Sequence, residues 1–128
     1  MRLALGLSFA LLPAVAFACP EGETARKMQS DQALGFETVL NLADPPLSQP
    51  FELEVQFCGD LTPDRIDVDA IMPAHQHGMN YVPNIEKLDR GVFAVEGMLF
   101  HMPGVWQVQV TAHSGDDVAR FTYDLELK

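Results

Sequence analysis

The sequence predicts an all-β protein, an antiparallel β-sandwich of about seven strands preceded by a signal peptide. Several segments alternate apolar and polar residues with a period of two, and clusters of Gly, Pro and Asp separate them. No segment has the periodicity of an amphipathic helix. A small β-barrel is the alternative architecture. The length of 128 residues suits one domain.

The N-terminus has the features of an export signal. Arg2 supplies one positive charge, Leu3–Ala18 carries no other, and Ala16-Phe17-Ala18 has the small-x-small pattern of a signal peptidase site. This apolar run is shorter than the roughly 20 residues that span a bilayer as a helix. We therefore expect cleavage after Ala18 and a mature protein in the periplasm. An uncleaved anchor and lipidation of Cys19 are the alternatives, although Phe17 is bulky for a lipobox.

Cys19 and Cys58 are the two cysteines of the chain. Because exported thiols usually oxidise, we expect a disulfide between them. It would close a loop of about 40 residues and attach the new N-terminus to the domain. In the competing interpretation, both thiols bind copper.

The mature chain is predicted to consist of a polar leader, residues 19–31, and a sandwich domain, residues 32–128. The leader is charged and has no apolar period. In the domain, Phe51–Phe57 shows the clearest alternation of apolar residues with Glu and Gln. The segments with a strand pattern are, in order, Phe36–Leu42, Phe51–Phe57, Arg65–Ala70, Val92–Phe100, Val105–Val110 and Arg120–Leu127.

The charge of the chain limits its possible partners. It has 18 acidic residues against 8 basic ones, and a formal net charge of −10. This balance argues against a nucleic-acid binder, which needs basic patches to neutralise phosphates. It also argues against electrostatic docking onto an anionic membrane surface.

Histidines and methionines concentrate in two short segments, residues 72–79 and 98–102. In an extended segment, His75, His77 and Met79 project to one face. Imidazole and thioether donors suit copper, whereas thioether is a poor ligand for Mg²⁺ or Ca²⁺. If the two segments lie side by side, the sequence predicts a copper site. Its candidate ligands are His75, His77, Met79, His101 and Met102.

An ordinary structural explanation is also available for these residues. Methionine often fills cores, and we expect Met72, Met98 and Trp106 to be core residues. His113 precedes Ser114-Gly115-Asp116 and is expected to be exposed in a turn. If the His and Met side chains only pack or contact a partner, the protein is a metal-free β-sandwich interaction module in the periplasm.

The sequence does not indicate an enzyme. It contains no nucleophile elbow, no Gly-rich phosphate loop and no His-Glu-x-x-His helix. A cupin metal site begins with His-x-His but needs a Glu four or five residues later, where Tyr81 and Val82 stand. We therefore expect no catalytic residues.

Two motifs carry a resemblance to a known family. Met72-Pro73-x-His75-x-His77-Gly78 is followed by Gly91 and by Phe100-x-Met102-Pro103-Gly104-x-Trp106. Over residues 33–112 the chain resembles the YtkA-like family of exported domains and the periplasmic FixH-like part of oxidase-assembly proteins. This resemblance implies an immunoglobulin-like β-sandwich outside the cytoplasm, linked to copper handling or respiratory oxidase assembly. We therefore expect a periplasmic copper-binding or copper-delivery protein whose partner is a periplasmic or membrane-bound copper protein.

Overall fold

The computed structural model describes residues 19–31, 37–59 and 62–128. These residues form strands and loops, and no helix among them could cross a membrane. The predicted signal peptide, residues 1–18, lies outside the described residues.

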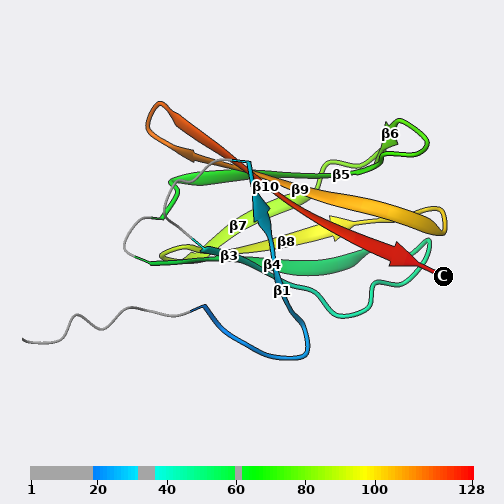
Figure 1. Ribbon diagram of the computed structural model, residues 1–128, viewed down its shortest axis with the longest axis horizontal. Coiled ribbons are helices and arrows are strands. Elements are labelled where there is room, and N and C mark those ends of the chain that lie inside the picture. Colours follow the sequence, from blue (N-terminus) through cyan, green and yellow to red (C-terminus); the bar gives the residue numbers. More distant parts are fainter. Residues whose placement is uncertain (1–18, 32–36, 60–61) are drawn as a thin grey trace, which may run out of the picture.

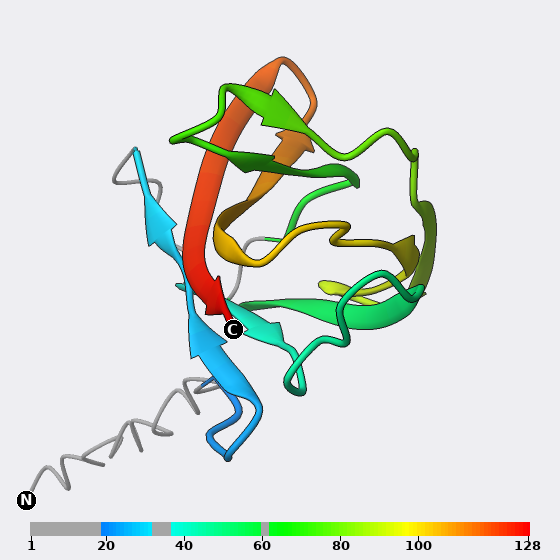
Figure 2. The same ribbon diagram turned by 90° about the vertical axis from the view of Figure 1, so that its right-hand side faces the viewer.

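Two antiparallel sheets of five strands each pack face to face, as Figures 1 and 2 show. The first has the order β1-β3-β4-β8-β7 and the second β2-β10-β9-β5-β6. This architecture confirms the predicted antiparallel sandwich. The strands are β1 (Ala25–Lys27), β2 (Gln29–Ser30), β3 (Glu37–Asn41), β4 (Phe51–Cys58), β5 (Arg65–Met72), β6 (His77–Gly78), β7 (Asn84–Asp89), β8 (Val92–Met98), β9 (Gly104–Ser114) and β10 (Asp117–Leu127).

The period-two pattern explains how the core forms. In β5, Ile66, Val68 and Ala70 point inward and are buried, while Arg65, Asp67 and Asp69 are exposed. The strands β4, β8 and β9 alternate in the same way. Burying a large apolar side chain contributes about 1.5–3 kcal/mol to the free energy of unfolding. The largest fully buried side chains are Trp106, Phe93, Phe100, Phe121, Leu40, Met72 and Met98.

The segment predicted as a polar leader contains two short strands. Strand β1 pairs with β3 in the first sheet, and β2 pairs with β10 in the second. Between them, Met28 is buried in the core with 5% of its surface exposed. The segment thus crosses from one sheet to the other, as Figure 2 shows.

Cys19 and Cys58 form the predicted disulfide. Their Cα atoms are 5.2 Å apart, and Cys58 is the last residue of β4. The bridge therefore lies at the C-terminal end of β4. The N-terminal end of the strand is Phe51, which pairs with Met98 of β8.

Candidate functional site

The two His/Met segments meet at one end of the sandwich. The first segment leaves β5 through a tight turn, in which the backbone N–H groups of His75 and Gln76 both donate to the carbonyl of Met72, at 3.1 and 2.9 Å. Strand β6 then pairs back onto β5, with His77 opposite Met72. Figure 1 shows this hairpin projecting from the second sheet.

The second segment is the loop between β8 and β9, residues 99–103. Phe100 anchors it: its side chain is fully buried, and its carbonyl accepts a hydrogen bond from the N–H of Ser48 at 2.8 Å. Phe100 also forms an isolated parallel bridge with Leu47. Phe100 points into the core, and the ring of its neighbour His101 contacts that of His77 in the β6 hairpin.

Three of the four histidines lie in contact through their rings. The ring centroids of His77 and His101 are 5.4 Å apart, and the rings are stacked at 30°. Those of His75 and His77 are 5.6 Å apart, nearly perpendicular at 86°. The structure thus brings together His75, His77 and His101, as the copper hypothesis requires.

The spacing of these rings is suitable for sharing one ion. With a metal–nitrogen bond of roughly 2.0 Å, two imidazoles on one ion have centroids about 5 Å apart. However, the residues that the structure describes contain no group of three or more His, Cys, Asp or Glu side chains already arranged to hold a metal ion. The three rings would therefore have to rotate to direct their nitrogens at one point, and thioethers would have to complete the site.

His101 has a nitrogen with an unusual environment. Its Nδ1 atom is buried and has no hydrogen-bond partner among the residues that the structure describes. A buried polar atom without a partner costs about 1–3 kcal/mol of stability, so such atoms are rare and call for an explanation. A neutral imidazole nitrogen with a free lone pair is a metal ligand, and a bound metal ion would satisfy this atom.

The methionines divide into two groups. Met72 and Met98 are buried in the core, as predicted. Met79 and Met102 are partly buried and pack against the edge of the core. Met79 follows β6 directly, and Met102 follows His101, so both candidate thioethers border the histidine cluster in the chain.

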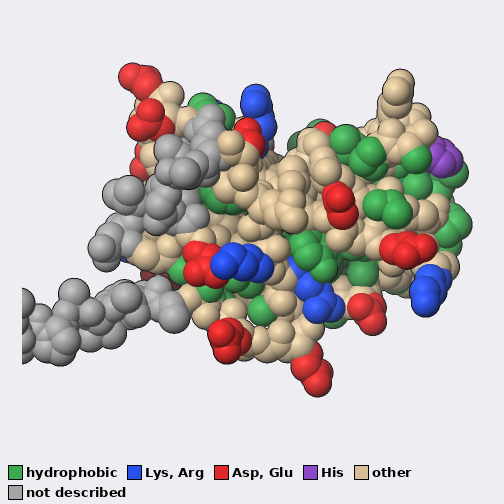
Figure 3. All heavy atoms as spheres, in the orientation of Figure 1, with side chains coloured by type: hydrophobic (Ala, Val, Ile, Leu, Met, Phe, Trp, Pro, Cys, Tyr) green, Lys and Arg blue, Asp and Glu red, His purple; other side chains and the backbone are tan. Residues whose placement is uncertain are grey.

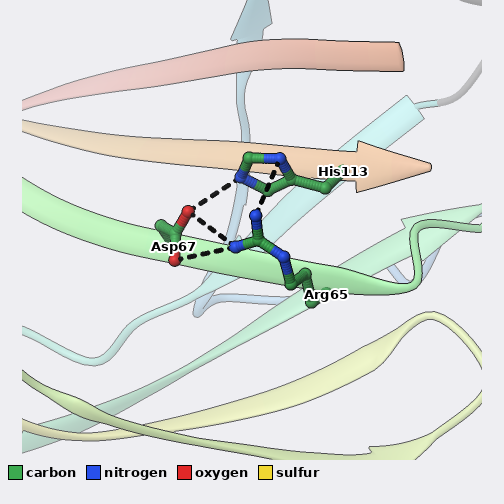
Figure 4. A network of polar contacts seen from close by, with 3 residues as sticks. All are labelled: Arg65, Asp67 and His113. Carbon is green, nitrogen blue, oxygen red and sulfur yellow. Dashed lines mark hydrogen bonds and ion pairs between the residues drawn. The ribbon is translucent and has the colours of Figure 1, made fainter. Parts of the chain in front are cut away.

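His113 is not the exposed turn histidine that the sequence suggested. It lies in β9, opposite Arg65 of β5, and its side chain is 19% exposed. Its Nε2 atom is 2.8 Å from Asp67 Oδ2, and its Nδ1 atom is 3.3 Å from an Arg65 guanidinium nitrogen. Figure 4 shows this network. Since the partner residues lie far away in the sequence, the turn signal at Ser114-Gly115-Asp116 could not reveal the pairing.

Trp106 is a site residue that the sequence analysis assigned only to the core. It is a core residue, as predicted, with no exposed surface. Its ring also contacts the rings of His77 and His101, at centroid distances of 6.1 and 5.4 Å. The position of Trp106 in the Pro103-Gly104-x-Trp106 motif is the one signal that could have suggested its contact with the histidines.

The surface at this end of the molecule is open to solvent. Figure 3 shows a histidine exposed there beside hydrophobic side chains. A groove of about 570 Å³ lies elsewhere, between residues 42–47 and the last residues of β10, and its lining includes none of the five candidate ligands. The candidate site is therefore recognised by its side chains and not by this groove.

Neither family models, nor curated proteins, nor solved structures give a match to this chain.

Proposed function

We propose that this chain is a periplasmic copper-binding or copper-delivery protein, with a site formed by His75, His77, Met79, His101 and Met102. The observation that carries the proposal is the contact of three imidazole rings, one of which, His101, has a buried ring nitrogen without a hydrogen-bond partner among the described residues. Residues from two separate segments of the chain contribute to it. Copper is the cargo, and the domain is its carrier.

The donor types determine which copper ion the site prefers. Thioethers are soft donors that favour Cu(I), whereas imidazoles accept both Cu(I) and Cu(II). The site borders the core. Cu(I) suits such a place because it needs few ligands and no water. We therefore propose that Cu(I) is held by imidazole and thioether together, and that Cu(II) is bound less tightly.

The disulfide and the N-terminal sequence support the proposal that the protein is exported. The disulfide is compatible with an oxidising compartment, and the first 18 residues have the pattern of a cleaved signal. The YtkA-like and FixH-like resemblance adds respiratory oxidase assembly as the proposed destination of the copper. The acceptor would be a periplasmic or membrane-bound copper protein.

The test is a competition titration of the mature protein with a chromophoric Cu(I) chelator, and a parallel one with a Cu(II) chelator. The double variant His75→Ala/His77→Ala should lose Cu(II) binding and weaken Cu(I) binding. Met79→Leu/Met102→Leu keeps the side-chain volume and should weaken Cu(I) selectively.

His113→Ala is the matched control, because His113 lies at the far end of β5 and β9 from the candidate site. It should change neither affinity. If wild type and the double-histidine variant compete equally with the chelator, the protein does not bind copper at this site.

A metal-free interaction module is the second candidate. Tyr81 and Val82 follow Met79 closely and are 53% and 96% exposed. Exposed apolar side chains beside a histidine cluster are also what a partner surface offers. The same titration separates the two functions, because this module would not compete with the chelator for either copper ion.

A further inference from the structure

We propose that Trp106 is the positioning residue of the copper site, holding His77, His101 and Met102 in place and keeping water away from His101. This inference rests on the proposed function. It adds a residue that is not among the five candidate ligands and assigns it control over the preference for Cu(I).

The indole is itself held firmly. Trp106 lies in β9 opposite Leu125 of β10, with no exposed surface. Phe100 stacks on it at a centroid distance of 4.8 Å and an interplanar angle of 23°. Phe51 packs against Phe100 in turn, at 4.9 Å. A row of aromatic rings thus connects β4 through the core to the histidine cluster.

Trp106 contacts three of the five candidate ligands. Its ring meets those of His77 and His101 at 70° and 77°, both edge-to-face arrangements. Its Nε1–H donates a hydrogen bond of 2.9 Å to the carbonyl oxygen of Met102. One buried side chain therefore fixes two imidazoles and the backbone that carries a thioether.

These contacts have a consequence for the metal. Residues that orient ligands, and the apolar shell around a site, typically change metal affinity by 10–100-fold when mutated. The indole is fully buried and packs against the rings of His77 and His101, so it covers that side of the site with an apolar surface. Cu(II) prefers a square arrangement of four or more donors, whereas Cu(I) accepts fewer and softer ones. Trp106 therefore favours Cu(I) by fixing Met102 and by excluding water.

The first experiment compares Trp106→Phe with wild type in the two competition titrations. Phenylalanine keeps an aromatic ring but cannot donate to the Met102 carbonyl. Cu(I) affinity should fall about tenfold, and Cu(II) affinity should change less. Phe93→Leu is the control: Phe93 is also buried, but its ring contacts Phe57 and Lys87. This variant should lose stability and keep the ratio of the two affinities.

A spectroscopic measurement separates positioning from a merely structural role. In protein with ¹³C-labelled methionine methyl groups, Cu(I) should shift the methyl resonances of Met79 and Met102. In Trp106→Phe the shift of Met102 should shrink while that of Met79 remains. Suppose that wild type binds Cu(I) and that the variant keeps both the ratio of the two affinities and the Met102 shift. This result would overturn the inference about Trp106 but not the proposed function.

The wild-type protein offers a test that does not depend on how the variant folds. Trp106 is the one tryptophan of the chain, so indole fluorescence reports on this position only. Cu(I) should change its emission with the same midpoint as in the competition titration. Unchanged emission at full occupancy would show that the indole does not line the site. Failure of wild type to bind Cu(I) at all would instead overturn the proposed function, and this inference with it.

Discussion

The rings of His77 and His101 lie 5.4 Å apart, although one residue belongs to the β6 hairpin and the other to the loop between β8 and β9. The two imidazoles meet because β5 and β9 pair directly, with Ile71 opposite Gln107. The end of β5 and the start of β9 therefore lie side by side. This pairing joins the two halves of the candidate site.

Replacing His101 by Phe should stabilise the metal-free protein. The change removes the buried, unpaired Nδ1 atom and keeps an aromatic ring beside His77 and Trp106. The expected gain is about 1 kcal/mol in the free energy of unfolding, which corresponds to a rise in Tm of about 4 °C. Thermal unfolding followed by circular dichroism measures it. The same variant should bind copper more weakly.

The control for this prediction is His113→Phe. Both ring nitrogens of His113 have partners, Asp67 and Arg65, so phenylalanine there removes contacts without relieving an unpaired atom. Its Tm should not rise. If His101→Phe lowers Tm as His113→Phe does, the Nδ1 atom of His101 is not a destabilising group.

Gly104→Ala should disturb the loop that carries His101 and Met102. Gly104 has a φ of +124°, and an added Cβ would lie 2.9 Å from the terminal methyl group of Met72. The backbone conformation alone is expected to cost about 1–3 kcal/mol, and the contact with Met72 adds to it. Urea denaturation should show this loss, and chelator competition should show weaker Cu(I) binding.

Gly59→Ala provides a matched comparison. Gly59 has a similar φ of +113°, but an added Cβ would meet no atom of the described residues within 4 Å, its chain neighbours aside. It should therefore cost only the backbone strain and leave copper affinity unchanged. Equal losses of stability in the two variants would mean that Met72 moves aside without cost.

Removing the disulfide should destabilise the fold and leave the proposed copper site intact. The bridge spans a sequence separation of 39 residues, and a loop of that size is worth about 4 kcal/mol in the chain-entropy model. Cys19→Ser/Cys58→Ser should show this loss in urea denaturation. Its Cu(I) affinity should equal that of wild type, because the bridge lies at the other end of β4. A large loss of affinity would instead favour the cysteines as copper ligands.

The sequence predicted the core strands well, because burial on one face leaves a period-two pattern. The expected segment Phe51–Phe57 and the observed β4 differ by one residue. The predicted Arg120–Leu127 covers most of β10, which begins three residues earlier, at Asp117. There the chain makes a hairpin with β9, and its first residues are exposed on both faces.

The strands that sequence reasoning missed carry no such pattern. Strand β7 lies at the edge of its sheet, and Ile85 is its one residue that is not exposed. Strands β1, β2 and β6 have only two or three residues each, too few for a period to appear. Their place is set by their partners, which are distant in the sequence.

The sequence indicated the residue types of the candidate site and the two segments that carry them, but not how their rings contact one another. The His and Met spacing suggested copper, yet nothing in the chain revealed the stacking of His77 on His101 or the contacts of Trp106 with both rings. The stacking of the two histidines and the contacts of Trp106 depend on the pairing of β5 with β9 and on the row of aromatic rings behind the site. Likewise, His113 seemed to belong to a turn because its partner Asp67 comes from another strand.

The pairing of β2 with β10 determines when the fold can be completed. Ser30 of β2 lies opposite Phe121 of β10, the last strand that the structure describes. Contacts between such distant residues slow folding, because a long loop must close before they can form. The second sheet cannot acquire its outer strand until the final residues of the chain have been made. Until β10 is present, β2 therefore has no strand to pair with in the second sheet as the structure describes it.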